Sequence, residues 1–141
     1  MAEGMLRAML EREGASGVSV GSAGTAGIEG MPATAPAVAV TAEHGIDLSG
    51  HVSRALTREL AEASDLILAM TRGHEQDILA TAPSVEGRVF LLSEFAGVGD
   101  ADVPDPIGGP EEEYREVYGM LDEMLEAAVP RIVKAAEEKR G

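Results

Sequence analysis

The stretch 65-DLILAM-70 decides the fold of this 141-residue chain. Its apolar residues run without interruption from Leu66 to Met70, which is typical of a strand buried on both faces. The stretch 88-RVFLL-92 has the same character and predicts a second buried strand. Between them, Thr71 is placed to cap a helix that ends near Pro83. A strand, a helix and a strand in this order predict a parallel pair.

Working outward toward the N-terminus, 18-VSVGSAGT-25 alternates small and β-branched residues and predicts a third, short strand running into a loop. The first helix is predicted from Met1 to a stop at Gly14. Its apolar positions fall on one face, at Met1, Met5, Leu6, Met9 and Leu10. The segments 26–33 and 93–110 are punctuated by Gly and Pro and are predicted to be loops.

Three more helices are predicted from capping residues. Thr34 begins a helix that ends at about His44, with Gly45 at the left-handed position beyond it. Thr57 begins a single short helix over 58-RELAEAS-64. The last helix begins at Pro110, has three glutamates at its positive end, and runs to the end of the chain with a bend at Pro130.

Strands that alternate with helices predict an α/β fold with a parallel sheet and helices on both of its faces. We find no repeat, linker or low-complexity tract, so we expect a single domain over residues 1–141. Three parallel strands are few, because most such sheets contain about four or more.

The composition excludes several classes of function. The net charge of −14 opposes non-specific binding to nucleic acid. No apolar run reaches the roughly 18–20 residues needed to cross a bilayer, so we expect a cytoplasmic protein without a membrane partner. The chain has no cysteine, which excludes disulfides, thiolate metal sites and a cysteine nucleophile from these 141 residues. No histidine pair has metal-site spacing, so neither a metal nor another cofactor is expected.

Asp105 is the strongest candidate for chemistry in the residues themselves. It lies between Pro104 and Pro106, which restrict its backbone, so its carboxyl is held as a positioned proton donor would be. The alternative is a turn aspartate that stabilises its own backbone. We interpret the nearby Asp102 as a solvated loop charge.

The other candidates are weaker. The glycines at 21, 24 and 27 of 21-GSAGTAG-27 fit a phosphate-binding loop or, more simply, a tight strand exit. The position of His51 is equally typical of a site residue and of a residue that makes hydrogen bonds within its own loop. We interpret His44 as a residue that satisfies the carbonyl groups at a helix end, and His74 as a solvated residue in the first turn of a helix.

Seven stretches, taken together and in order, resemble the low-molecular-weight protein tyrosine phosphatases, particularly bacterial members that include protein arginine phosphatases. They are 1-MAEGMLR-7, 22-SAGT-25, 43-EHGIDLSGHVSRALT-57, 65-DLILAMTRGH-74, 89-VFLLSEFAG-97, 103-VPDPIGG-109 and 112-EEYREVY-118. The resemblance implies a three-layer sandwich and the hydrolysis of phosphotyrosine or phosphoarginine on proteins, or of small phosphate esters. It also implies a cysteinyl-phosphate intermediate.

The resemblance also implies roles for four residues of this chain. Asp105 corresponds to the general acid that protonates the leaving group and then activates water. Ser22 and His51 correspond to the polar network that supports the phosphate-binding loop. Ile107 follows the acid where tyrosine-specific members often place an aromatic residue, so it forms the substrate-side wall and mildly favours another substrate, such as phosphoarginine.

This sequence departs from the family pattern at its start. Members begin with a strand and a Cys-x5-Arg-Ser phosphate loop, and Met1 matches the methionine that follows this loop. We therefore expect the central first strand of the family sheet to be missing and this chain to be inactive. In order of preference, the explanations are a misassigned start, a truncated remnant whose strand edges close or self-associate, and a non-catalytic pseudophosphatase that binds a partner.

Overall fold

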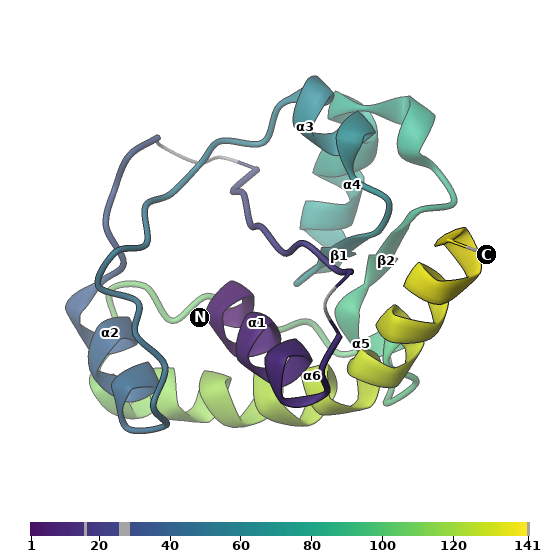
Figure 1. The fold of residues 1–141 in the computed structure, drawn as a ribbon. Helices are drawn as coiled ribbons and strands as arrows, with labels where there is room; N and C mark the ends of the chain where they lie inside the picture. Colours follow the sequence, from purple (N-terminus) through teal and green to yellow (C-terminus); the bar gives the residue numbers. More distant parts are fainter. Residues whose placement is uncertain (16, 26–28, 141) are drawn as a thin grey trace.

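The computed structural model describes residues 1–15, 17–25 and 29–140 (Figure 1). Its elements alternate between helix and strand along the middle of the chain. In order they are α1 (Ala2–Arg12), α2 (Ala35–Ala42), α3 (Arg58–Ala63), β1 (Ile67–Ala69), α4 (Arg72–Thr81), the 3₁₀ helix η1 (Pro83–Val85), β2 (Val89–Leu91), α5 (Leu92–Phe95) and α6 (Glu111–Arg140).

The two strands predicted from the apolar stretches form the sheet. β1 and β2 are parallel, and Leu68 lies opposite Phe90 in their register. The predicted strand over 18–25 is wrong, because the sheet of the described residues has the order β1–β2 and does not include this segment. A strand needs a neighbour that exchanges backbone hydrogen bonds with it. Within the described residues, the strand-like pairing of this segment is limited to the isolated bridge between Gly24, near its C-terminal end, and Ala55.

Helices cover both faces of the sheet, which confirms the α/β class. α1, α2 and α6 enclose the larger core, in which Met5, Val40 and Leu125 are buried. α3, α4 and η1 enclose a smaller core on the other face, and Figure 1 shows α3 and α4 on the side of the sheet away from α6. β1 contributes side chains alternately to the larger and the smaller core, because successive side chains of a strand point to opposite faces. Leu66, Leu68 and Met70 pack against the larger core, and Ile67 and Ala69 belong with the smaller one.

The helix ends follow the predicted caps with one exception. The hydroxyl oxygen of Thr57 accepts a hydrogen bond from the backbone nitrogen of Leu60, at 3.1 Å. Thr71 does the same for His74, at 3.0 Å. Thr34 does precede α2, but its hydroxyl donates to the Tyr114 hydroxyl at 3.0 Å and does not cap the helix. This side chain therefore joins α2 to α6.

The region after β2 differs most from the sequence prediction. We expected an irregular loop from Ser93, whereas the structure has the short helix α5, whose end is held by a hydrogen bond from Arg131 Nη1 to the Phe95 carbonyl oxygen at 3.0 Å. α6 contains Pro130, and its C-terminal part turns away from the direction of its first part (Figure 1). No helix in the described ranges is long and apolar enough to span a membrane.

Candidate active site

Glu3, in the first turn of α1, is the centre of a polar cluster. The Ser22 hydroxyl donates to Glu3 Oε1 at 2.7 Å. Arg7, one turn further along α1, places Nη2 3.0 Å from Glu3 Oε2. His51 places Nδ1 3.9 Å from the same oxygen. The predicted residues Ser22 and His51 are therefore brought together by a carboxylate between them.

The backbone around Ser22 is held by Arg54. Arg54 Nε donates to the Ser22 carbonyl oxygen at 3.3 Å. Its guanidinium lies against Gly21, where a Cβ atom would collide with it. A side chain at position 21 would therefore displace the end of the flexible Arg54 side chain from this position. Of the other two glycines in this stretch, Gly24 pairs with Ala55 and Gly27 lies outside the described residues.

Asp105 lies in the loop that leads from α5 to α6. Its Oδ1 accepts a hydrogen bond from the backbone nitrogen of Ile107, at 3.1 Å. The turn interpretation is therefore confirmed, but the turn also fixes the carboxylate, which is exposed. The loop is joined to the end of β1 by the hydrogen bond from Val103 N to the Met70 carbonyl oxygen, at 2.8 Å.

The Met1 amino group is influenced by the charge of Asp105 as well as by that of Glu3, the centre of the polar cluster. Burial lowers the pKa of the Met1 amino group, while the charges of Glu3 and Asp105 act in the opposite direction. Both carboxylates therefore lie within electrostatic range of the start of α1. The N-terminus of a helix has a partial positive charge and unpaired amides, which favour an anion.

The remaining candidates lie around this site or away from it. Ile107 is 68% exposed, so its side chain is accessible next to Asp105. Asp102 is not simply solvated, since its Oδ1 accepts from the backbone nitrogen of Arg72 at 3.0 Å. His44 stacks on Tyr118 with ring centroids 4.1 Å apart, and His74 lies in the first turn of α4.

Glu3 is the residue that sequence reasoning missed. Its signal was the i, i+4 pair with Arg7 on the first turns of a helix, a pattern that is common on solvated surfaces. Only the fold brings Ser22 and His51 to the same carboxylate. Burial would raise the pKa of Glu3, but the hydrogen bonds from Ser22 and Arg7, with the charges of Arg7 and His51, outweigh it and lower the pKa.

We expect Glu3→Gln to destabilise the protein at pH 7 by about 1 kcal/mol, since it removes a charged hydrogen-bond acceptor. The pKa of Glu3 is lower in the folded state than its ordinary value of 4.5. Its stabilisation is therefore present above that value and is lost as the pH falls through the lower folded pKa. Urea unfolding of both proteins between neutral and acid pH measures this stabilisation, and the two curves of unfolding free energy against pH should converge at low pH.

Glu116→Gln, at an exposed position on α6, is the matched control. A constant difference at all pH values would contradict the prediction.

Comparison with known proteins finds similar sequences that cover most of the chain. The family model for low molecular weight phosphotyrosine protein phosphatases matches residues 1–139. The low molecular weight protein-tyrosine-phosphatase Etp of Escherichia coli K12 is 41% identical over 113 residues, which cover 80% of this chain and 75% of Etp. The protein-arginine-phosphatase of Bacillus subtilis is 38% identical over 134 residues, which cover 95% of this chain and 88% of that protein.

The fold is also shared with solved structures. A serine mutant of the YwlE arginine phosphatase, with a phosphorylated active-site serine, superimposes with a TM-score of 0.87 and 37% sequence identity. The match covers 99% of this chain and 88% of that one. The predicted fold class is confirmed by this match. The sequence, the sheet with its two helical layers and these similarities lead to one conclusion: the chain belongs to the low molecular weight phosphotyrosine protein phosphatase family.

Proposed function

We propose that this domain provides the acid–base and loop-supporting residues of a protein phosphatase. The observation that supports this most strongly is the convergence of Glu3, Ser22 and His51 at the start of α1. Asp105 lies within electrostatic range of the same end of the helix. A phosphoryl group at this end would lie beside the helix amides and within electrostatic range of the Asp105 carboxyl.

In the proposed reaction, a cysteine thiolate attacks phosphorus and the bond to the leaving group breaks. The Asp105 carboxyl gives its proton to the leaving oxygen or nitrogen. Asp105, now ionised, then takes a proton from the water that attacks the phosphocysteine. This releases inorganic phosphate and restores the thiolate. Ser22 and His51, through Glu3, hold the backbone on which the phosphate-binding loop would rest.

The substrate we propose is a phosphorylated side chain of a protein. Etp is named a protein-tyrosine-phosphatase, and the Bacillus relative is named a protein-arginine-phosphatase. The exposed side chain beside Asp105 is the aliphatic Ile107, which cannot stack on a phenol ring as an aromatic residue can. This mildly favours phosphoarginine over phosphotyrosine.

The nucleophile cannot come from these 141 residues, because none of them is a cysteine. We therefore expect no hydrolysis of para-nitrophenyl phosphate above background by this chain. A chain extended at Met1 by a strand and a Cys-x5-Arg-Ser segment should hydrolyse it, and vanadate should inhibit the reaction. The control is the same extension with serine in place of the cysteine.

An extended protein that is folded and soluble but inactive would overturn the enzyme proposal. It would favour the alternative function, a non-catalytic remnant or pseudophosphatase domain that binds a partner. Vanadate-sensitive turnover by the 141-residue chain would overturn the proposed nucleophile. Self-association through a strand edge stays a prediction, and light scattering by the 141-residue chain would measure it.

A further inference from the structure

The loop that carries Asp105 is joined by hydrogen bonds to the rest of the described molecule only at its two ends. It leaves the larger core at Val103, whose backbone nitrogen donates to the Met70 carbonyl oxygen at 2.8 Å. Between residues 104 and 109, the hydrogen bonds among the described residues are internal to the loop, as is the one from Ile107 N to Asp105 Oδ1 at 3.1 Å. The position of the Asp105 carboxylate therefore depends on where the loop begins and where it ends.

The loop returns to the larger core at Tyr114, in the first turns of α6. Tyr114 is 4% exposed and belongs to the same buried cluster as Val103. It directly follows Glu113, whose backbone nitrogen donates to the Pro110 carbonyl oxygen at 3.0 Å and whose carboxylate lies against Gly109. A shift of Tyr114 would therefore move the end of the loop with it.

Tyr114 is in turn joined to α2. Thr34, which precedes α2, donates its hydroxyl to the Tyr114 hydroxyl oxygen at 3.0 Å, a contact that we call the hydroxyl pair. Figure 1 shows α2 lying beside the first part of α6. Arg115 joins the same two helices through Glu43, but these side chains are 45% and 43% exposed, and exposed ion pairs contribute little. The hydroxyl pair is partly buried, where a hydroxyl without a partner is costly, so it is the stronger constraint.

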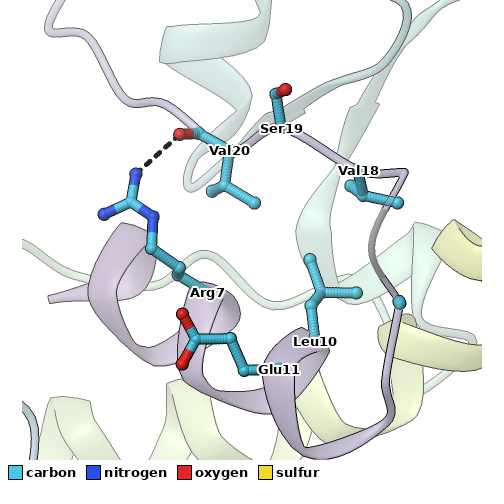
Figure 2. A pocket seen from close by; sticks show the side chains of 7 residues that line it. Arg7, Leu10, Glu11, Val18, Ser19 and Val20 are labelled. Atoms are coloured by element: carbon cyan, nitrogen blue, oxygen red, sulfur yellow. Dashed lines mark hydrogen bonds between the residues drawn. The ribbon is translucent and has the colours of Figure 1, made fainter.

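The polar cluster around Glu3 is supported from a different direction. Arg7 Nη2 lies 3.0 Å from Glu3 Oε2 and donates to the Val20 carbonyl oxygen at 2.8 Å, which joins α1 to the segment before the cluster's serine (Figure 2). Among the described residues, the hydrogen bonds and ion pairs of this cluster do not involve the hydroxyl pair. Loss of the hydroxyl pair should therefore act on the Asp105 loop and leave the cluster in place.

We propose that Tyr114, held by Thr34, is a positioning residue for Asp105. The inference rests on the proposed function, in which Asp105 protonates the leaving group. Proton transfer requires the carboxyl to lie within hydrogen-bond reach of the leaving atom, and a small misplacement of a catalytic group lowers the rate. Without the Tyr114 hydroxyl, the end of the loop at α6 is free to shift, and Asp105 spends less time within reach.

The test uses the chain extended by the Cys-x5-Arg-Ser segment and two substrates that differ in their leaving groups. Phenyl phosphate releases a more basic oxygen than para-nitrophenyl phosphate and therefore depends more on the acid. We expect Tyr114→Phe to lower kcat/KM by about tenfold for phenyl phosphate and by about twofold or less for para-nitrophenyl phosphate, since it removes only part of the acid's contribution. Vanadate affinity should be unchanged. A purely structural role would lower stability without changing the ratio of the two kcat/KM values.

The second tyrosine of α6 provides the matched control. Tyr118 is 9% exposed, and its ring stacks on His44, a contact that does not need the hydroxyl. Both kcat/KM values of Tyr118→Phe should therefore equal those of the extended parent.

Variants of Thr34 test the other half of the hydroxyl pair. Thr34→Val should reproduce the loss, whereas Thr34→Ser keeps a hydroxyl and should retain the parent values. The double variant of Thr34→Val and Tyr114→Phe should lose no more than either single variant, because both remove the same contact. Circular dichroism checks folding, and Thr34→Val tests the proposal if Tyr114→Phe does not fold.

Amide exchange in the 141-residue chain gives a readout that needs no catalysis. The Ile107 amide donates to Asp105 Oδ1, so NMR should show faster exchange of this amide with water in Tyr114→Phe than in the parent or in Tyr118→Phe. An extended parent that is folded but inactive would overturn the proposed function, and the Ile107 amide would then show by itself whether Tyr114 holds the loop.

Three outcomes would overturn the proposal. The first is equal kcat/KM values for the Tyr114 and Tyr118 variants of an active extended protein. The second is an equal loss with both substrates, which would indicate a general destabilisation. The third is an Ile107 exchange rate that Tyr114→Phe leaves unchanged.

Discussion

In a chain extended by the Cys-x5-Arg-Ser segment, Asp105→Asn is expected to lower kcat by about 10²–10⁴-fold, the usual contribution of a positioned general acid. The asparagine keeps an oxygen that can accept from the Ile107 nitrogen, so the turn should persist. The change therefore removes the proton and the charge but keeps the loop. Stopped-flow and steady-state hydrolysis of para-nitrophenyl phosphate measure the loss.

Two measurements separate a chemical role of Asp105 from a structural one. Vanadate affinity should change little, because binding depends on the helix end and the phosphate loop. The acid limb of the kcat–pH profile should change shape, since the titrating carboxyl has been removed. Asp102→Asn is the matched control, because Asp102 lies in the same loop but bonds to the backbone of Arg72. Equal kcat values for the Asp105 variant and the parent would remove Asp105 from the mechanism.

The parts of the fold that could be predicted from sequence are those with a local cause. Thr57 and Thr71 cap helices through their own hydroxyls, and continuous apolar runs mark β1 and β2. Thr34 has the same residue type in the same position, yet its hydroxyl bonds to Tyr114, 80 residues away. No local pattern distinguishes these two uses of a threonine.

The wrong strand has the same explanation. The alternation around Val18 and Val20 is that of a strand, and both side chains pack on the core as a strand's would. Strand formation, however, requires a paired neighbour, and among the described residues the pairing of this segment is limited to the isolated bridge between Gly24 and Ala55. The short helix α5 was missed because four residues are too few for a helical period to appear.

The candidate site also has one part with a local cause and one part that depends on contacts between distant segments. Asp105 was found from two prolines in sequence, and its turn is local. The meeting of Ser22 and His51 at Glu3 joins three segments that are distant in sequence. The resemblance to the family indicated Ser22 and His51, but only the packing of α1 identifies Glu3 as the group that connects them.

The second large effect is expected for Leu125→Ala, which should lower the free energy of unfolding by about 2–5 kcal/mol. Leu125 is 2% exposed on α6 and belongs to the same buried cluster as Met5 on α1 and Val40 on α2. α6 packs against α1, α2 and α5, so a cavity at this position weakens the support of the helix on which the candidate site begins. A domain of this size has a stability of only about 5–15 kcal/mol, so the change is a large share of it.

Urea unfolding followed by circular dichroism measures the loss, and the midpoint should fall with little change in slope. Val98→Ala removes two carbons at a residue that is 46% exposed, and it should change the stability by no more than about 0.5 kcal/mol. The contrast tests whether α6 is the main support of α1. If Leu125→Ala cost no more than Val98→Ala, the larger core would not depend on α6, and the position of the Glu3 cluster would have to be maintained by the segment around Ser22 and Arg54 instead.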